Sequence, residues 1–242
     1  MSRSLRIVVV SAFVLAASAA VAGDPPLEAR VNALEQKVIE LQRELETLKK
    51  APPSGPAREA ALQEKPYTVP VGDSPVLGNK QARINLVVFG DLQCPFCGRS
   101  HEFLKQVVDD PALKKRVNVV FKNFPLSFHR DAKPAAMLAM AVRELGGDDA
   151  FWRFVDLAYQ NQRDLQPETL KRLATTAGVD GERAAALAHA KEATYQAVID
   201  VDQKLALGIG VRGTPTFYLG GWQLADRTVD GVKALLEQKN LP

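Results

Sequence analysis

The sequence predicts an α/β domain, in which a small mixed sheet carries an inserted helical subdomain, preceded by a separate coiled-coil helix. A short apolar run rich in β-branched residues, Ala82–Phe89, is typical of a buried strand, and a second strand is expected at Val117–Phe124. Strand signals return only near the end of the chain, on either side of Gly220-Gly221. Between these two groups the apolar pattern is helical, which predicts an insertion over about 128–207.

Composition divides the chain into four segments. Arg3 and Arg6 precede an apolar, charge-free run, and Ala20-Val21-Ala22 offers the small residues of a cleavage site, so we expect a signal peptide and export to the periplasm. A retained membrane anchor is the alternative, although the apolar run is short for a membrane span. The expected segments are a signal peptide at 1–22, a coiled-coil helix at 24–50, a linker rich in proline at 51–66 and the main domain at 67–242.

The charge balance argues against a nucleic-acid partner. The sequence has 31 basic and 28 acidic side chains, and loss of Arg3 and Arg6 with the signal peptide would leave 29 basic ones. A chain so close to neutrality is expected neither to bind nucleic acid nor to be strongly attracted to a membrane surface.

The first helix carries an unbroken heptad pattern. Its two apolar rows are Val31, Val38 and Leu45 at position a, and Leu27, Leu34, Leu41 and Leu48 at position d. Such a seam is typical of a coiled coil, and oppositely charged residues flank it at positions e and g. β-branched residues at a favour dimers, but the stretch from Arg30 to Glu35 resembles a pattern of short parallel trimers, so we favour a homotrimer over a dimer. A solvated single helix, or a helix packed on its own domain, is the alternative.

The only two cysteines, Cys94 and Cys97, lie where the first strand gives way to a helix. Pro95 suits a first helical turn, because an N–H at that position has no partner within the helix. Cys94 therefore lies at a helix N-terminus, where the helix dipole and the free N–H groups stabilise a thiolate. The spacing also allows Cys97 to resolve a mixed disulfide at Cys94. We expect a redox pair, with zinc or copper binding as the alternative.

A second motif lies far along the chain, where Thr214-Pro215 directly precedes a predicted strand. Proline has no N–H for a strand ladder, so it belongs at the start of the strand or in a tight turn, positions compatible with a cis peptide bond. Alone this motif is a weak indication of function, but in combination with the cysteine turn it is a strong one.

The strand, the Cys94-Pro95-Phe96-Cys97 turn, the helical insertion and the Thr214-Pro215 motif closing into a hairpin together resemble the DsbA-like branch of the thioredoxin superfamily. The N-terminal helix is similar to that of trimeric ScsC-like members. The resemblance covers about 73–241 and implies a thioredoxin fold with an inserted helical domain. It also implies that Cys94 attacks and Cys97 resolves, that Pro95 and Phe96 form the active-site loop, and that Thr214 and a cis Pro215 bind extended client peptides.

The resemblance implies thiol–disulfide exchange with exported client proteins, no cofactor or metal, and a redox partner in the membrane. An N-terminal helix that assembles several such domains resembles the design of disulfide isomerases, so an isomerase is the preferred function. A DsbA-type disulfide oxidase is the first alternative. A client-binding chaperone or a Cu(I)-binding protein would be alternatives of another class.

Several positions depart from the family pattern or leave their role open. The active-site dipeptide lacks the histidine of the most oxidising members, and Val88 replaces the buried acid that thioredoxin holds six residues before its first cysteine. Thr214 occurs in isomerases and oxidases alike. Asp91 is expected to form a turn, with a nearby acid as the alternative, and His129 is expected to be a surface or capping residue rather than a proton carrier.

Overall fold

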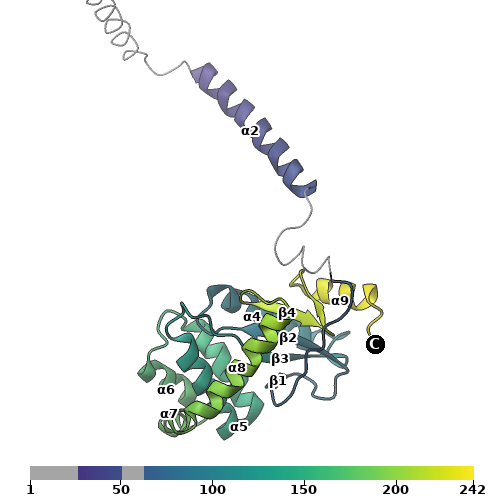
Figure 1. Cartoon of the computed structure of the whole chain (residues 1–242). Coiled ribbons are helices and arrows are strands. Elements are labelled where there is room, and N and C mark those ends of the chain that lie inside the picture. The colour runs from purple at the N-terminus through teal and green to yellow at the C-terminus, as the bar shows by residue number, and fades with distance from the viewer. Residues whose placement is uncertain (1–26, 51–62) are drawn as a thin grey trace, which may run out of the picture. The chain divides into compact units, whose positions relative to one another are not determined.

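The computed structural model describes residues 27–50 and 63–242, which belong to two separate units. The first holds helix α2 (Leu27–Lys50), and the second, here called the C-terminal unit, holds the sheet and the helices that follow it (Figure 1). The predicted signal peptide and most of the predicted linker lie outside the described residues. In the two ranges that are described, no helix has the length and apolar character needed to cross a membrane.

Helix α2 runs for 24 residues without a break, as the heptad pattern predicts. The seam residues whose side chains are described all face water, with exposed fractions of 44% for Val31, 67% for Leu34, 52% for Val38 and 52% for Leu41. The helix thus carries a continuous apolar stripe on its surface.

The described strands form one mixed sheet in the order β1-β3-β2-β4-β5. Its strands are β1 (Val76–Leu77), β2 (Ile84–Gly90), β3 (Val117–Asn123), β4 (Thr216–Leu219) and β5 (Trp222–Gln223). Strands β2 and β3 are parallel, whereas β4 runs antiparallel to β2, with Thr216 opposite Phe89. This register brings the start of β4 beside the end of β2, where the cysteine turn begins.

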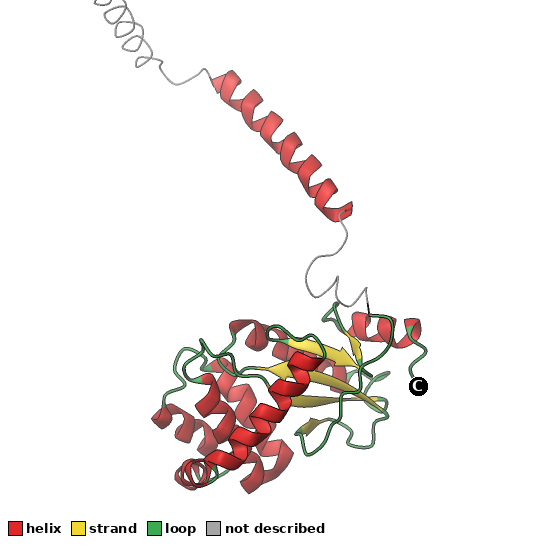
Figure 2. Cartoon of the chain, viewed as in Figure 1, coloured by secondary structure: helices red, strands yellow, loops and turns green. Residues whose placement is uncertain are grey.

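Helices cover both faces of the sheet (Figure 2). They are α4 (Pro95–Asp109), α5 (Ala132–Gln160), α6 (Pro167–Thr176), α7 (Gly181–Ala190), α8 (Glu192–Gly208) and α9 (Val229–Gln238). Successive residues of a strand point to opposite faces. Leu86 and Val88 of β2 therefore join a core with Leu104 of α4, while Phe89 joins a second core with Ala206 of α8. Both faces of β2 are buried, which explains its continuous apolar run.

The structure confirms the α/β fold class and the helical insertion, and it differs from the sequence predictions in detail. The apolar pattern predicts one helical run over Arg183–Leu207, but Lys191, with φ −108° and ψ 20°, separates α7 from α8. Strand β1 was not predicted, because two residues are too few for a periodic signal. The Gly146-Gly147 pair, which is typical of a helix break, interrupts α5, where Gly147 has φ 74° and ψ −172°.

A buried ion pair fastens α8 to the end of β3. Lys122 Nζ lies 3.1 Å from Asp202 Oδ1, and the other carboxylate oxygen accepts the backbone N–H of Asn123 at 2.8 Å. Lys122 also donates to the carbonyl oxygen of Val71 at 3.1 Å. Burying two charges is unfavourable unless further hydrogen bonds satisfy them, as they do here. The pair fixes the end of β3, from which a loop of the candidate site departs.

Contacts of the C-terminal unit begin within the segment predicted as linker. The side-chain amide of Gln63 donates to the carbonyl oxygen of Gly221 at 2.8 Å, and its oxygen accepts the backbone N–H of Gln223 at 2.8 Å. Tyr67 N–H donates to the same Gly221 carbonyl at 2.9 Å. A version of the chain shortened to this unit should therefore retain Gln63.

Candidate active site

The two cysteines lie at the junction of β2 and α4. Cys94 is the N-cap of α4, with extended φ and ψ of −73° and 119°, and Pro95 occupies the first turn, as predicted. The carbonyl oxygen of Cys94 accepts the N–H groups of Cys97 at 3.0 Å and Gly98 at 3.2 Å. The Cys94 side chain makes no capping hydrogen bond to the helix, so its sulfur is available for other contacts.

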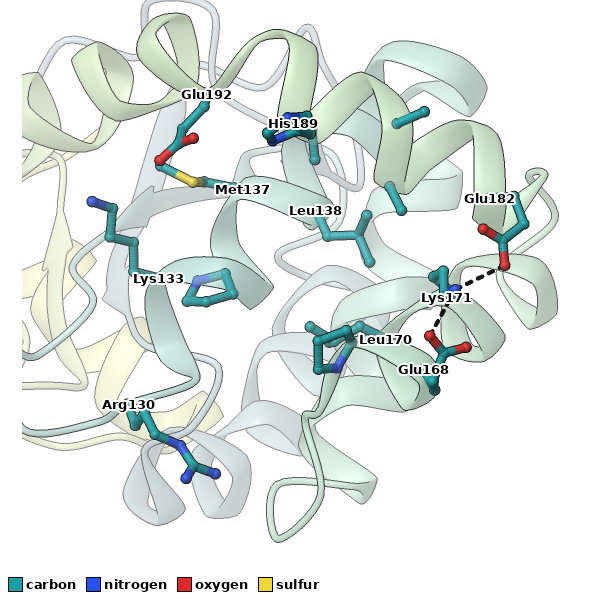
Figure 3. Close-up of a pocket in the computed structure, with 15 residues that line it drawn as sticks. Arg130, Lys133, Met137, Leu138, Glu168, Leu170, Lys171, Glu182, His189 and Glu192 are labelled. Carbon is teal, nitrogen blue, oxygen red and sulfur yellow. Dashed lines mark ion pairs between the residues drawn. The ribbon is translucent and has the colours of Figure 1, made fainter.

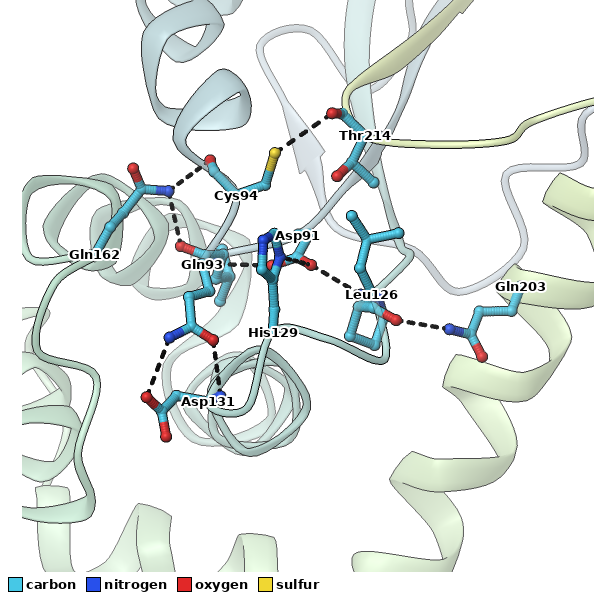
Figure 4. Close-up of polar contacts among 11 residues, drawn as sticks. Asp91, Gln93, Cys94, Leu126, His129, Asp131, Gln162, Gln203 and Thr214 are labelled. Atoms are coloured by element: carbon cyan, nitrogen blue, oxygen red, sulfur yellow. Dashed lines mark hydrogen bonds and ion pairs between the residues drawn. The ribbon is translucent and has the colours of Figure 1, made fainter. Parts of the chain in front are cut away.

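The surroundings of Cys94 favour its thiolate. Only 3% of the residue is exposed, and in its protonated form the thiol donates a hydrogen bond to the carbonyl oxygen of Thr214 at 3.3 Å (Figure 4). A hydrogen bond from the Cys97 thiol is the largest influence on the ionisation of Cys94. Burial opposes that influence, but smaller contributions from the Thr214 side chain and from the backbone of Phe96 and Cys97 help to lower the pKa of Cys94 to about 5. A thiol with such a pKa is largely ionised at neutral pH and is a ready nucleophile.

Cys97 has the opposite character. It is also 3% exposed, on the inner face of α4, and burial raises its pKa well above the usual range of a thiol. Proximity to the Cys94 sulfur raises it further. In this structure both cysteines are free thiols. One ionised, reactive thiol beside one protonated, buried thiol is the arrangement expected of an attacking and a resolving cysteine.

The structure brings the second motif to the cysteines although 120 residues separate Thr214 from Cys94. The Thr214-Pro215 peptide bond is cis, and β4 begins directly after it. Because β4 pairs with β2, this loop borders the cysteine turn. The six residues proposed from the sequence therefore meet at one place, and Phe96 among them is 60% exposed.

Asp91 holds the cysteine turn to a neighbouring loop. Its side chain is fully buried, and one carboxylate oxygen accepts the N–H of Gln93 at 2.7 Å, which is the turn role that the sequence predicts. The other oxygen accepts the N–H of Leu126 at 2.8 Å and contacts His129 Nδ1 at 2.7 Å. The expectation of a surface or capping role for His129 is therefore wrong, because its side chain is only 18% exposed and pairs with Asp91.

Further polar residues around the turn were not found by sequence reasoning. Gln162 Nε2, in the turn after α5, donates to the carbonyl oxygens of Leu92 at 3.0 Å and Cys94 at 2.7 Å. The side chain of Gln93 donates to Asp131 Oδ2 at 3.1 Å and accepts the Asp131 N–H at 2.8 Å (Figure 4). These hydrogen bonds connect the helical insertion to the cysteine turn. Nothing local in the sequence marks these contacts, since their partners lie 38 to 70 residues apart.

A cavity of about 800 Å³ lies between α5, α6 and α7, away from the cysteines (Figure 3). Met137, Leu138 and Leu170 contribute its apolar lining. At its rim Lys171 pairs with Glu168 at 2.8 Å and with a second glutamate, Glu182, at 2.9 Å. Neither cysteine lines this cavity, so the reactive groups belong to the cysteine turn. Within 27–50 and 63–242, no group of three or more His, Cys, Asp and Glu side chains is arranged to hold a metal ion.

Comparison with known proteins agrees with this geometry. A family model described as thioredoxin matches residues 71–238. The probable disulfide bond formation protein D of Bacillus cereus is 29% identical over 174 residues, which represent 67% of this chain and 77% of that protein. The Na(+)/H(+) antiporter NhaA 1 of Salinispora arenicola is 30% identical over 147 residues, or 60% of this chain, but the chain spans only 21% of the length of that antiporter.

Solved structures show the same fold. DsbA2 of Pseudomonas aeruginosa is 25% identical, with a TM-score of 0.57, over 73% of this chain and 100% of that one. ScsC of Proteus mirabilis, in a transitional conformation, is 19% identical with a TM-score of 0.58, and the match covers 98% of both chains. The chain belongs to the thioredoxin family, and its structural neighbours include proteins of the DsbA and ScsC type.

Proposed function

We propose that this chain is a protein thiol–disulfide oxidoreductase that exchanges disulfides with exported client proteins through Cys94 and Cys97. The observation that carries the proposal is the contrast between the two thiols. Cys94 has a pKa lowered to about 5 and faces the Thr214 loop, whereas Cys97 is buried with a raised pKa. The name of the Bacillus cereus relative, a probable disulfide bond formation protein, supports the same chemistry.

In the oxidising direction, a client thiolate attacks the Cys94 sulfur of the Cys94–Cys97 disulfide. A new disulfide forms between client and Cys94, while Cys97 leaves with the electron pair of the broken bond. A second client thiolate then displaces Cys94, which leaves as a stable thiolate because its pKa is low. In the reshuffling direction, the Cys94 thiolate attacks a client disulfide and the released client thiolate attacks elsewhere in the client.

We assign peptide binding to the loop that ends in the cis Thr214-Pro215 bond, together with Pro95 and the exposed Phe96 of the active-site loop. The backbone of this loop would form hydrogen bonds with the backbone of an extended client segment, so binding would depend little on the client's sequence. The reaction needs no metal or organic cofactor. Export to the periplasm through a cleaved signal peptide at 1–22, and a redox partner in the membrane, are further parts of the proposal.

We infer that the chain assembles through α2 into a parallel homotrimer. The exposed stripe that includes Leu34 and Leu41 supports this assembly, since removal of such a stripe from water is what drives coiled-coil formation. Several tethered sites raise the effective concentration of a bound client, which favours repeated attack on wrong disulfides. For this reason disulfide isomerase is the preferred activity. A DsbA-type oxidase is the second candidate, and the name of the Bacillus cereus relative favours it.

The test is the refolding of a scrambled protein with several disulfides. Mature protein from Gly23 is compared with a version that begins at Pro53, the start of the C-terminal unit, so that Gln63 keeps its contacts. If the long form rearranges the client's disulfides while the short form only oxidises client thiols, the isomerase activity depends on α2. If both oxidise and neither reshuffles, the protein is an oxidase and the preferred activity is wrong.

Two matched substitutions in the full chain test the role of α2 without truncation. Leu34→Asp places a charge in the seam, whereas Ile39→Asp places the same charge at an apolar position off the seam that is 41% exposed. We expect only Leu34→Asp to yield monomers in analytical ultracentrifugation and to lose reshuffling. Equal effects of the two variants would contradict the proposed seam.

Two further measurements test the alternatives of another class. Anti-aggregation activity that is retained without the cysteines would favour a client-binding chaperone. Tight Cu(I) binding by the reduced pair without disulfide exchange would favour a copper-binding protein.

A further inference from the structure

Gln162, which follows α5, holds the two backbone carbonyl groups on either side of Gln93. Its Nε2 donates to the carbonyl oxygen of Leu92 at 3.0 Å and to that of Cys94 at 2.7 Å (Figure 4). A side-chain amide has two N–H donors, so this half-buried residue can hold both carbonyl groups at once. The reactive cysteine is thus fixed through its backbone by a residue 68 positions away.

Helix α4 leaves room for this amide by carrying a glycine. Gly98 lies in α4, directly after Cys97, and its φ is not positive. A Cβ at this position would lie 2.7 Å from Gln162 Oε1 and 3.1 Å from Gln162 Cδ, so a side chain there would displace the amide. Glycine is unfavourable in a helix interior, and the backbone angle does not require it here. Contact with Gln162 is therefore the structural reason for a glycine at position 98.

The other end of α5 is bonded to the same turn. Asp131, which precedes α5, donates its N–H to Gln93 Oε1 at 2.8 Å, and its carboxylate accepts from Gln93 Nε2 at 3.1 Å. A straight helix of 29 residues would be about 44 Å long, so its two ends could not both reach neighbouring residues of one turn. They do so because the break at Gly147 folds α5 back on itself. The helical insertion therefore holds residues 92–94 at two points.

The exchange reaction needs the Cys94 sulfur in one defined orientation. The backbone of Cys94 sets that orientation, since only one rotatable bond separates its Cα from the position of the sulfur. The Cys94 carbonyl oxygen also accepts the N–H groups of Cys97 and Gly98, so a donor that fixes this carbonyl group fixes the first turn of α4 as well. Misplacement of a reacting atom by about 1 Å can slow a reaction by about a hundredfold. A residue that holds this carbonyl group therefore controls the reaction rate.

We propose that Gln162 is a positioning residue of the exchange reaction, which acts through the Cys94 carbonyl group to fix the Cys94 sulfur where a client sulfur can attack it. This inference rests on the proposed function. In the positioned step the client thiolate bonds to the Cys94 sulfur, the Cys94–Cys97 bond breaks, and Cys97 takes the electron pair of that bond. Gln162 gives up no proton in this step and acts only through the backbone.

Gln162→Met tests this role, because methionine keeps the length of the side chain and removes both donors. We expect reduced glutathione to open the oxidised pair of the variant about tenfold more slowly than that of the wild type. The midpoint of Cys94 alkylation by iodoacetamide should move from near pH 5 to about pH 6 or higher, because a turn that is no longer held stabilises the thiolate less well. A residue that only stabilises the fold would not shift this pH profile.

Asn161→Leu is the matched control. Asn161 is the neighbouring amide, and its Nδ2 donates to the carbonyl oxygen of Leu157 at 2.8 Å, within the end of α5 and not to the cysteine turn. The substitution likewise removes the amide donors and keeps most of the side-chain volume, yet we expect an unchanged opening rate and pH profile. Thermal unfolding of both variants reports any loss of folded protein. Equal changes of rate and profile in the two variants would overturn the positioning role.

Gly98→Ala breaks the same contact from α4 and provides a second test if Gln162→Met does not fold. Alanine favours a helix over glycine, so helix propensity alone predicts no loss of α4. The added methyl group would displace the Gln162 amide, and we expect slower opening of the disulfide and a higher alkylation midpoint, as with Gln162→Met. In a Gln162→Ala background the methyl group has room, so Gly98→Ala should cause no further change. Additive effects of the two substitutions would show that Gly98 does not act through Gln162.

The outcomes separate this inference from the proposed function. If the wild-type protein opens no client disulfide and accepts no client thiol, the proposed function fails. If the wild type exchanges disulfides and Gln162→Met matches it in both opening rate and pH profile, the role of Gln162 alone is overturned.

Discussion

Helices α2 and α4 are both amphipathic, but their apolar faces differ in how far they are exposed. Phe103, Leu104 and Val107 of α4 are 7%, 3% and 0% exposed, whereas Leu34 and Leu41 of α2 are 67% and 52% exposed. A buried face stabilises the fold and also excludes water from whatever it carries. Helix α4 carries Cys97 and His101 on that face, so burial there sets thiol chemistry as well as stability.

The contrast shows that one kind of sequence pattern serves two purposes. An isolated helix gains most of its stability in water from tertiary or quaternary packing, and α2 presents an apolar stripe for such packing on its surface. We therefore expect changes in α4 to alter chemistry or the stability of the C-terminal unit, and changes in α2 to alter assembly. Each prediction below tests one side of this division.

The largest effect is expected at the N-terminus of α4. Cys94→Ser should abolish disulfide exchange, because the hydroxyl that replaces the thiol cannot form the mixed disulfide, and insulin reduction should fall to the uncatalysed rate. Cys97→Ser should instead trap mixed disulfides at Cys94, visible by mass spectrometry of clients from a periplasmic extract. Full turnover by the Cys94→Ser variant would show that the chemistry lies elsewhere.

A pair of identical substitutions compares the two apolar faces directly. Leu104→Ala removes a 3% exposed side chain and should lower the unfolding free energy of the C-terminal unit by about 2–5 kcal/mol in urea denaturation. Leu34→Ala, on α2, should leave that unfolding free energy unchanged and weaken self-association instead. A comparable loss of stability from both substitutions would mean that α2 packs on the C-terminal unit.

The reactivity of Cys94 should follow its lowered pKa. Only the thiolate is alkylated, and a pKa of about 5 means that the folded, reduced protein holds the thiolate at neutral pH, where a free thiol is mostly protonated. The rate of iodoacetamide reaction at Cys94 should be near its maximum at pH 7 and fall about hundredfold by pH 3, with its midpoint near pH 5. A midpoint near pH 8.5 would show that the α4 N-terminus does not activate the thiol.

The smallest effect is expected from an exposed ion pair of α2. Lys37 Nζ contacts Glu40 at 2.7 Å, and both side chains are more than half exposed. Such a pair contributes at most about 0.5 kcal/mol, so Lys37→Ala should not measurably change the association constant in sedimentation equilibrium. A large loss of association would indicate that Lys37 contacts a partner chain rather than only Glu40.

The sequence alone determined the features that depend on neighbouring residues. The cysteine turn, the proline in the first turn of α4 and the length of α2 follow from local conformational preferences and from periodicity. The cis Thr214-Pro215 bond was expected from the resemblance to the DsbA-like branch. The turn role of Asp91 belongs to the same group, since its partner Gln93 is two residues away. The mixed sheet with inserted helices followed from the order of these local signals.

Only the tertiary structure decided which distant side chains surround the cysteines. Gln162 and His129 reach the turn across 68 and 38 residues, and no periodicity or spacing marks such contacts in advance. The sequence did not fix the pKa values either. A helix N-terminus favours the Cys94 thiolate, but the raised pKa of Cys97 depends on burial by residues from other elements. Burial and proximity arise only when the chain has folded, because they are properties of packing and not of local sequence.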